Sequence, residues 1–288
     1  MIESVVRAAP EGYAPPNVLT IAGVDPSGGA GVLADLKTFS ALGAYGCGVI
    51  AALTAQNTRA VTGIHEVPPE FLELQLDTLF DDVRIDAVKI GMLASSALIR
   101  VVADALRRHR PTFVVLDPVM VAKSGDRLLR AEAVDALRCE LLPLATLVTP
   151  NLPEGGDLLG RGLPDSPEAM REAARALRAL GPAAVLMKGG HLPGDRLVDI
   201  LFDGAEFVEL PAARVATKNT HGTGCTLSSA IAALLPQRTS VAAAVRDARE
   251  YVLGALRASS QLSVGSGHGP LHHFFALWPA SGAPAPAR

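Results

Sequence analysis

The amino-acid sequence predicts one α/β domain in which helices cover both faces of a mostly parallel central sheet. Short β-branched runs without polar and apolar alternation suit strands that are buried on both faces. Segments with helical spacing separate these runs, and short connections between a strand and the next helix favour parallel strands. The 288 residues, 49% of them hydrophobic, can bury one large core, and no linker divides them.

The expected strands are the short apolar runs. They are Val18–Ala22, Ala87–Ile90, Thr112–Leu116, Thr146–Thr149 and Ala183–Met187. Two further segments, Leu197–Phe202 and Glu206–Leu210, flank the turn signal Asp203-Gly204. This pattern predicts a hairpin, so the sheet should have an antiparallel edge.

The expected helices have apolar residues at helical spacing. They are Pro69–Phe80, Ala97–Arg108, Pro167–Leu180 and Leu227–Leu235. Ser166 before Pro167 is a typical helix start. Residues 1–17 and 276–288 are rich in Pro, Ala and Gly, and we expect a disordered N-terminal extension, a domain over residues 18–275 and a flexible C-terminal tail.

The charge balance and the cysteines exclude several classes of protein. With 26 Lys+Arg against 29 Asp+Glu, the net charge of −3 gives no basic surface for nucleic acid, which we do not expect as a partner. No apolar run has the length of a membrane span, and the N-terminus does not resemble a signal peptide. Cys47, Cys139 and Cys225 are widely spaced, as in reduced proteins. We therefore expect a cytoplasmic protein that does not bind membranes.

Glycine and polar residues follow five of the expected strands. These loops are Gly23–Gly31, Gly91-Met92, Asp117–Val119, Pro150–Glu154 and Lys188–His191. Because ligands of an open parallel sheet bind beyond the carboxyl ends of its strands, the loops predict one common site.

The segment Thr220–Thr226 (THGTGCT) precedes the last expected helix. Glycines at a helix start let backbone N–H groups converge on an anion, and the helix dipole adds positive charge. Neither P-loop nor Rossmann spacing is present, and an ordinary glycine turn is the alternative. Lys188 and Lys218 favour the anion site, because two cations beside it suit a nucleoside triphosphate.

Cys225 falls in the first turn of this helix, where the dipole and nearby lysines predict a lowered thiol pKa. A buried core thiol is the alternative. Phosphoryl transfer asks little of a base, so a thiolate could suffice. Our hypothesis is that Cys225 is the base; the other possibility is that it only lines the anion hole.

Several long stretches resemble the hydroxymethylpyrimidine/phosphomethylpyrimidine kinases of thiamine biosynthesis, which belong to the ribokinase-like superfamily. The matching stretches are Leu19–Gly46 (LTIAGVDPSGGAGVLADLKTFSALGAYG), Thr54–Thr58 (TAQNT), Val83–Leu93 (VRIDAVKIGML), Val115–Leu129 (VLDPVMVAKSGDRLL), Thr149–Glu154 (TPNLPE), Val185–His191 (VLMKGGH), Thr217–Ala230 (TKNTHGTGCTLSSA) and Gly269–Phe274 (GPLHHF). The resemblance implies a ribokinase-like three-layer α/β/α sandwich and, by family membership, a homodimer.

Carried over residue by residue, the resemblance implies a role for each part of the site. A pyrimidine pocket would consist of Gly23, Asp35, Gln56, Met92 and Val119, and the Gln56 amide would bond the ring because it offers both a donor and an acceptor. The ATP side would consist of Lys188, Lys218, Asp117 and Asn151, with Glu154 holding Mg²⁺ through water. The anion hole would consist of Gly222, Thr223 and Gly224, with Cys225 where many superfamily members carry an aspartate. Residues 122–126 would form a flap.

The resemblance implies an enzyme with ATP as co-substrate and Mg²⁺ as cofactor. It would phosphorylate 4-amino-5-hydroxymethyl-2-methylpyrimidine (HMP) to its monophosphate and then to its diphosphate. One alternative is a pyridoxal/pyridoxine kinase, since pyridoxine also has a hydroxymethyl group on an aromatic ring. Another is a catalytically silent protein that senses the pyrimidine. The adjacent histidines of Leu271–Phe274 lack a third ligand, which predicts packing rather than a metal site.

Overall fold

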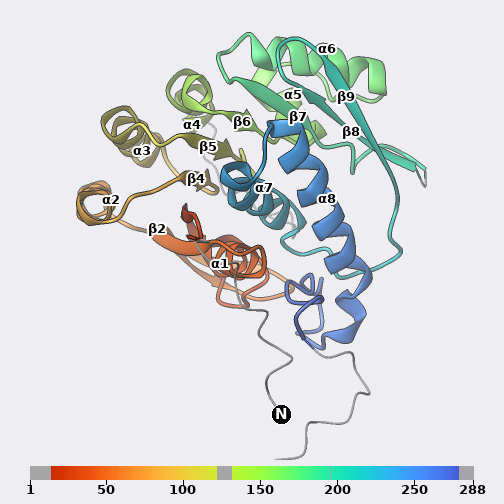
Figure 1. Cartoon of the computed structure of the whole chain (residues 1–288), viewed down its shortest axis with the longest axis horizontal. Coiled ribbons are helices and arrows are strands. Elements are labelled where there is room, and N and C mark those ends of the chain that lie inside the picture. The colour runs from red at the N-terminus through yellow and green to blue at the C-terminus, as the bar shows by residue number, and fades with distance from the viewer. Residues whose placement is uncertain (1–13, 122–131, 195, 279–288) are drawn as a thin grey trace, which may run out of the picture.

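The computed structural model describes residues 14–121, 132–194 and 196–278, in which a single sheet of nine strands lies between two layers of helices (Figure 1). The strand order is β3-β2-β1-β4-β5-β6-β7-β8-β9. The strands are β1 (Asn17–Val24), β2 (Tyr45–Gln56), β3 (Val61–Glu66), β4 (Ala87–Ile90), β5 (Phe113–Leu116), β6 (Leu147–Val148), β7 (Ala184–Met187), β8 (Arg196–Phe202) and β9 (Phe207–Ala213).

The main helices connect these strands. They are α1 (Gly31–Ala41), α2 (Pro69–Asp82), α3 (Ser96–His109), α5 (Leu152–Leu159), α6 (Pro167–Arg178), α7 (Thr223–Leu234) and α8 (Val241–Arg257), with the short α4 (Ala133–Ala136) leading into a π turn at Leu137–Leu141. The predicted cap is present, since the Ala169 N–H donates to Ser166 Oγ at 3.2 Å. No helix of the described ranges is both long and apolar enough to cross a membrane.

The middle of the sheet is parallel and both edges are antiparallel. Strands β2, β1, β4, β5, β6 and β7 pair in parallel; five of them follow the predicted β-branched runs, whereas β2 was not predicted. The predicted hairpin is β8–β9, and β8 pairs antiparallel with β7. The opposite edge was not predicted: β3 pairs antiparallel with β2 and its side chains are mostly exposed, so it lacks the apolar run that marks the central strands.

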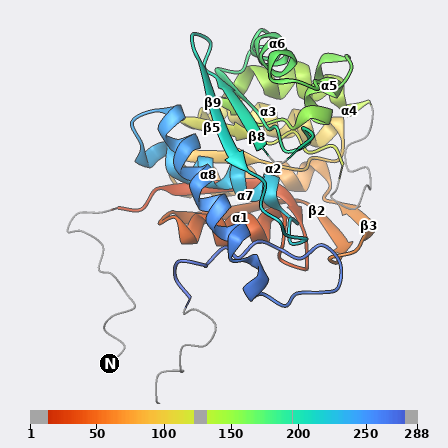
Figure 2. The ribbon, with the colours of Figure 1, turned by 90° about the vertical axis from the view of Figure 1, so that its right-hand side faces the viewer.

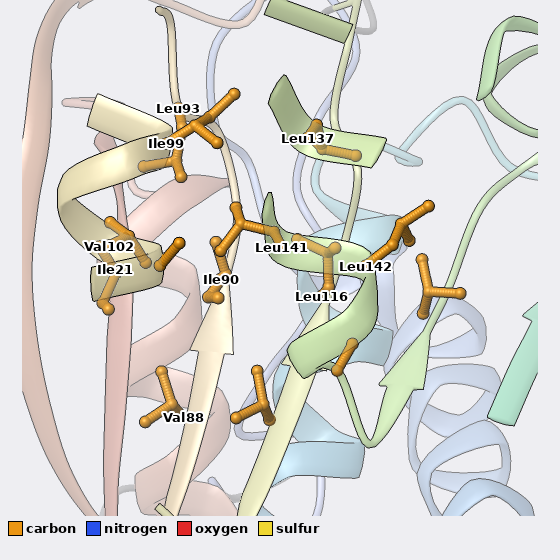
Figure 3. Packing of buried hydrophobic residues seen from close by; sticks show 14 of the residues in the cluster. Ile21, Val88, Ile90, Leu93, Ile99, Val102, Leu116, Leu137, Leu141 and Leu142 are labelled. Atoms are coloured by element: carbon orange, nitrogen blue, oxygen red, sulfur yellow. The ribbon is translucent and has the colours of Figure 1, made fainter. Parts of the chain in front are cut away.

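Alternate residues of each central strand enter two separate cores, which is the physical reason for their unbroken apolar runs. Leu19, Val88 and Val148 pack under α2, α3, α5 and α6. Their neighbours Val18, Ala87 and Leu147 pack under α1, α7 and α8. Figure 3 shows the first core, where Ile90 and Leu116 meet Val102 of α3 and Leu141 of the π turn. The predicted three-layer α/β/α sandwich is confirmed.

The ends of the domain differ slightly from the predicted boundaries. Asn17 already belongs to β1, and its backbone N–H donates to Asp86 at 2.9 Å. At the other end, the Trp278 ring packs against His272 and Phe274. Residues 17 and 276–278 are therefore part of the domain rather than of its tails. The rest of both predicted tails lies outside the described residues, except for residues 14–16, which precede β1.

Candidate active site

A cavity of about 670 Å³ lies at the carboxyl ends of the parallel strands, where the sequence predicts the site. The loops after β1, β4, β5, β6 and β7 contribute to its wall, together with β2 and the N-terminus of α7. Most of the predicted site residues line it: Gly23, Gln56, Met92, Asp117, Val119, Asn151, Glu154, Lys188, Gly222, Thr223, Gly224 and Cys225.

The N-terminus of α7 forms the predicted anion hole. Gly222 is its N-cap, with a φ of +78°, and a Cβ there would lie 1.8 Å from the Gly29 carbonyl oxygen, so only glycine fits. Among the described residues, the backbone N–H groups of Gly224 and Cys225 have no hydrogen-bond acceptor. Such N–H groups point out of a helix start, so they are available to an anion.

Lys188 brings a positive charge to this helix start. Its Nζ lies 3.4 Å from the point where a Cβ of Gly224 would be. It donates to Asp117 Oδ1 at 2.9 Å and lies 3.8 Å from Glu154 Oε2. Burial would lower the pKa of Lys188, but the two carboxylates outweigh burial and hold it above its usual range. The ammonium group therefore stays charged beside the anion hole.

Asp117 stays ionised although it is buried. Burial alone would raise its pKa, but the charges of Lys188 and Lys89 outweigh burial and lower it. Hydrogen bonds from the Thr149 and Ser228 hydroxyl groups, at 3.2 and 3.3 Å, hold the carboxylate in place.

Asn151 and Glu154, three residues apart, form a capping box at the start of α5. The Glu154 N–H donates to Asn151 Oδ1 at 2.9 Å, and the Asn151 N–H donates to Glu154 Oε2 at 2.8 Å. The spacing of three residues thus fixes both side chains at the cavity. Burial and the charge of Asp117 raise the pKa of Glu154 to about 7, although Lys188 partly opposes them.

Gln56 lies at the other end of the cavity, near the end of β2. The Thr54 hydroxyl lies 3.1 Å from Gln56 Oε1 and 2.8 Å from the Val24 carbonyl oxygen. A Cβ on Gly23 would come within 3.2 Å of Met92 Sδ, so glycine leaves room for this wall. An amide, a thioether and bare backbone can together hold a flat ring with polar edges.

Asp35 does not line the cavity, contrary to the resemblance. It is fully buried and accepts hydrogen bonds from Thr20 Oγ1 (2.6 Å), Ser229 Oγ (2.6 Å) and Lys89 Nζ (2.8 Å). Lys89 is the member of this group that lines the cavity. The Asp35 carboxylate is therefore turned toward these three donors rather than into the cavity.

Lys218 is also outside the cavity wall. It is exposed, in the segment between β9 and α7, and does not line the cavity. The sequence places Lys218 only a few residues before the glycine turn. In the structure a bend at Lys218–Thr220 separates Lys218 from that turn; within the bend the Thr220 N–H donates to the Lys218 carbonyl oxygen at 3.0 Å.

The structure contradicts the predicted pKa of Cys225. Burial raises the pKa of its thiol to about 11; Lys89 lowers it, but Asp35 and Asp117 raise it further. The helix dipole and the nearby lysines do not prevail, because the half-buried thiol is poorly hydrated and lies near two carboxylates.

Part of the cavity wall is apolar and was not predicted from the sequence; we call this part the apolar lobe. Leu197, Ala212, Val215, Val252, Leu253 and Leu256 line it, from the β8–β9 hairpin, the segment after it and α8, which lie side by side (Figure 2). Arg249 of α8 ties them together: its guanidinium donates to Asp199 at 2.8 Å and to the Leu210 carbonyl oxygen at 2.6 Å. Such apolar residues carry no local sign of a ligand, since they also fit a core.

Two other polar residues of the wall, Asp25 and His221, were inside the matching motifs but were given no role. The predicted flap, residues 122–126, lies outside the described residues. The adjacent histidines His272 and His273 are buried, and His273 lies 3.1 Å from Thr226 Oγ1, which confirms packing. The described part of the chain contains no group of three or more His, Cys, Asp or Glu side chains that could hold a metal ion.

Comparison with known proteins agrees with this geometry. A sequence profile of the family described as "Phosphomethylpyrimidine kinase" matches residues 25–272. The hydroxymethylpyrimidine/phosphomethylpyrimidine kinase of Escherichia coli is 54% identical over 91% of this chain and 98% of its own length. A relative of the same description from Rhizobium meliloti is 52% identical over 90% of this chain and 97% of its own length.

Solved structures share the ribokinase-like fold. An ADP complex of Bacillus subtilis pyridoxal kinase superimposes with a TM-score of 0.84 at 35% identity, and covers 91% of this chain and 99% of its own. This neighbour is a kinase, and the cavity described above has the anion hole and the cation that phosphoryl transfer requires. Both the sequence match along almost the whole domain and the conserved architecture lead to the same assignment: the chain belongs to the phosphomethylpyrimidine kinase family.

Proposed function

We propose that the protein transfers the γ-phosphoryl group of ATP to the hydroxymethyl group of HMP, and then a second phosphoryl group to the monophosphate, in thiamine diphosphate biosynthesis. One observation carries the proposal: a single cavity joins the Gln56 end, which suits an aminopyrimidine, to the α7 anion hole and Lys188. The family assignment supports the same reaction.

The residues of the cavity divide the work between the two substrates. The Gln56 amide would bond a ring nitrogen and the exocyclic amine, which directs the hydroxymethyl group toward α7. The N–H groups of Gly224 and Cys225 would bind oxygens of the phosphoryl group in flight, and Lys188 would neutralise its charge. The apolar lobe beside Arg249 would hold the adenine ring.

Cys225 would take part as a neutral thiol in the wall of the anion hole. A pKa of about 11 leaves on the order of one thiolate in ten thousand molecules at pH 7. A loose transition state keeps the proton on the attacking hydroxyl group until late, so a strong base is not required. The raised pKa therefore argues against the base hypothesis.

Mg²⁺ fits the oxygen donors at the carboxyl ends of β5 and β6. Asp117 and Glu154 supply carboxylates there, and the residues that the structure describes offer no third such ligand beside them. Such a site suits an ion that keeps several waters and binds phosphate oxygens. Bound there, the ion would neutralise charge on the transferred phosphoryl group.

We also propose a homodimer. The β2–β3 edge exposes Leu53 (51%) on one face of the sheet and Ile64 (41%) on the other, since Leu53 pairs with His65 and Ile64 pairs with Thr54. A second chain that covers this edge would bury them and would protect the exposed strand β3. A cytoplasmic location stays a prediction from the sequence.

Release of ADP in the presence of HMP, its monophosphate or pyridoxine tests the reaction. We expect turnover with both pyrimidines, a kcat/KM for pyridoxine at least about 100-fold lower because it cannot satisfy the Gln56 amide, and loss of turnover in Lys188→Ala. Binding of HMP without ADP release would instead indicate a sensor. Preference for pyridoxine would indicate a pyridoxal/pyridoxine kinase, the activity of the Bacillus neighbour.

A further inference from the structure

Asp25 and His221 form a buried pair in the cavity wall, although 196 residues separate them in the sequence. His221 Nε2 lies 2.7 Å from Asp25 Oδ2, and both side chains are less than a tenth exposed. Neither residue has a role in the chemistry proposed above. Both, however, lie at the start of a helix that faces the cavity.

Asp25 organises the loop between β1 and α1. Its carboxylate accepts hydrogen bonds from the Ser27 N–H and hydroxyl group, both at 2.9 Å, and from the N–H of Ala30, the N-cap of α1, at 3.0 Å. Burial would raise the pKa of Asp25, but the hydrogen bonds from His221 and Ser27 outweigh burial and lower it. The carboxylate is therefore a fixed negative charge at the start of α1.

His221 organises the start of α7. It directly precedes the N-cap Gly222, and its backbone N–H donates to the Gly269 carbonyl oxygen at 3.0 Å. Its ring lies close against the first loop: a Cβ on Gly29 would come within 2.4 Å of His221 Cδ2. The Gly29 carbonyl oxygen in turn occupies the space beside Gly222.

The two loops thus interlock, and each carries a different half of the active site. The end of β1 provides Gly23, which belongs to the part of the cavity wall proposed to hold the pyrimidine; we call this part the acceptor wall. The start of α7 provides the anion hole. Helices α1 and α7 pack side by side on the same face of the sheet (Figure 1). Reacting groups must meet at about 3–3.5 Å, so the separation of the loops decides whether transfer occurs.

We propose that Asp25 and His221 are positioning residues: their hydrogen bond holds the anion hole of α7 in register with the acceptor wall of β1. In this role the pair needs no contact with the phosphoryl group or the ring. It acts through the placement of Gly222–Cys225, and the assay of this role rests on the proposed kinase reaction. Loss of the bond should lower kcat and leave substrate binding nearly unchanged.

Two variants of nearly equal shape test the pair. In His221→Gln the side-chain amide can reach Asp25 and donate a hydrogen bond, whereas His221→Met has similar length and no donor. We expect His221→Met to lower kcat about 10- to 100-fold for both pyrimidine acceptors, with the KM for ATP and acceptor within about threefold. His221→Gln should keep kcat within about threefold. Asp25→Asn should lower kcat by a smaller factor when it is added to His221→Met than when it is introduced alone.

A measurement without turnover separates this proposal from the proposed function. Amide hydrogen exchange at Thr226, whose N–H bonds to the Gly222 carbonyl oxygen at 2.8 Å, reports the order of the first turn of α7. Exchange there should accelerate in His221→Met and not in His221→Gln, with both variants folded by thermal melting. The proposal would be overturned if His221→Met and His221→Gln had the same kcat and the same exchange at Thr226, or if His221→Met changed only KM. Absence of kinase activity in the unmodified protein would overturn the function alone.

Discussion

Cys225 lies in the first turn of α7, where the helix dipole favours a thiolate, yet burial keeps its proton in place. If the thiolate were the base, its fraction would grow tenfold per pH unit below a pKa of about 11. We expect instead that kcat is nearly constant from pH 7 to 9, and that Cys225→Ala loses less than about tenfold.

Single-turnover assays across this pH range make the distinction, with Cys225→Asp as the comparison because an aspartate occupies this place in many superfamily members. A tenfold rise in rate per pH unit, together with loss of transfer in Cys225→Ala, would restore the base role to Cys225.

Glu154 has a pKa raised to about 7, so the folded protein retains a proton that the unfolded chain releases above about pH 4.5. The free energy of unfolding should therefore fall as the pH rises from 4.5 to 7, and then level off. Glu154→Gln keeps an acceptor for the Asn151 N–H and removes the titration. We expect it to be more stable than the unmodified protein at pH 8, by about 1–3 kcal/mol, and to be slower with Mg²⁺ and ATP.

Urea unfolding without ligands at pH 5 and pH 8 measures this effect. Glu172→Gln, an exposed site within α6, is the matched control and should keep the pH dependence of the unmodified protein. An equal loss of stability with pH in Glu154→Gln would show that another group causes it.

At the scale of elements, the glycine that starts α7 has a steric role that differs from an ordinary helix cap. In Gly222→Ala the new methyl group would collide with the Gly29 carbonyl oxygen, which cannot move without the loop. We expect kcat to fall at least about 100-fold, because the anion hole shifts relative to the acceptor.

Gly160→Ala is the matched control for this element. Gly160 caps the end of α5 at a similar φ of +60°, but nothing lies within 4 Å of its Cβ position. This variant should lose about 1 kcal/mol of stability from backbone strain and no activity. Steady-state kinetics and thermal melting compare the two. Equal kinetic losses would mean that backbone strain, rather than the close approach to Gly29, explains the effect.

Helices and strands could be predicted from the sequence where a single local pattern marks them strongly. The buried central strands, the capped helix α6 and the hairpin β8–β9 each have a strong local pattern, and all are present. Strands β2 and β3 and helices α1, α5 and α8 were not predicted. The exposed side chains of β3 give no apolar alternation, and the buried face of α8 combines alanines with a buried arginine, Arg249, which marks a core face only weakly.

The site was predictable to the extent that its residues follow strand ends. The positions of Asp117, Glu154 and Lys188 follow from parallel topology, because all parallel strands end on one edge. Asp35 and Lys218 were misplaced because sequence proximity does not show whether a side chain faces a cavity, the core or solvent. The Asp25–His221 contact was invisible because it depends on tertiary packing across 196 residues.

At the scale of the whole molecule, the exposed apolar side chains of the β2–β3 edge predict the oligomeric state. Sedimentation should give a mass of about 60 kDa, twice the 29.9 kDa of one chain. Leu53→Lys combined with Ile64→Lys should shift the mass to that of a single chain, because charges at a buried interface are costly. Leu163→Lys, which changes an equally exposed leucine between α5 and α6, should not. A 30 kDa species in the unmodified protein would contradict the homodimer.

The link between the β1–α1 loop and the start of α7 also has a consequence for how the chain folds. Contacts between distant parts of a sequence form late, since the loop between them must close first. Native secondary structure should therefore return before the anion hole closes over the acceptor wall. During refolding from urea, circular dichroism should recover ahead of kinase activity, so that catalytic competence marks the last step of folding rather than the first compact state.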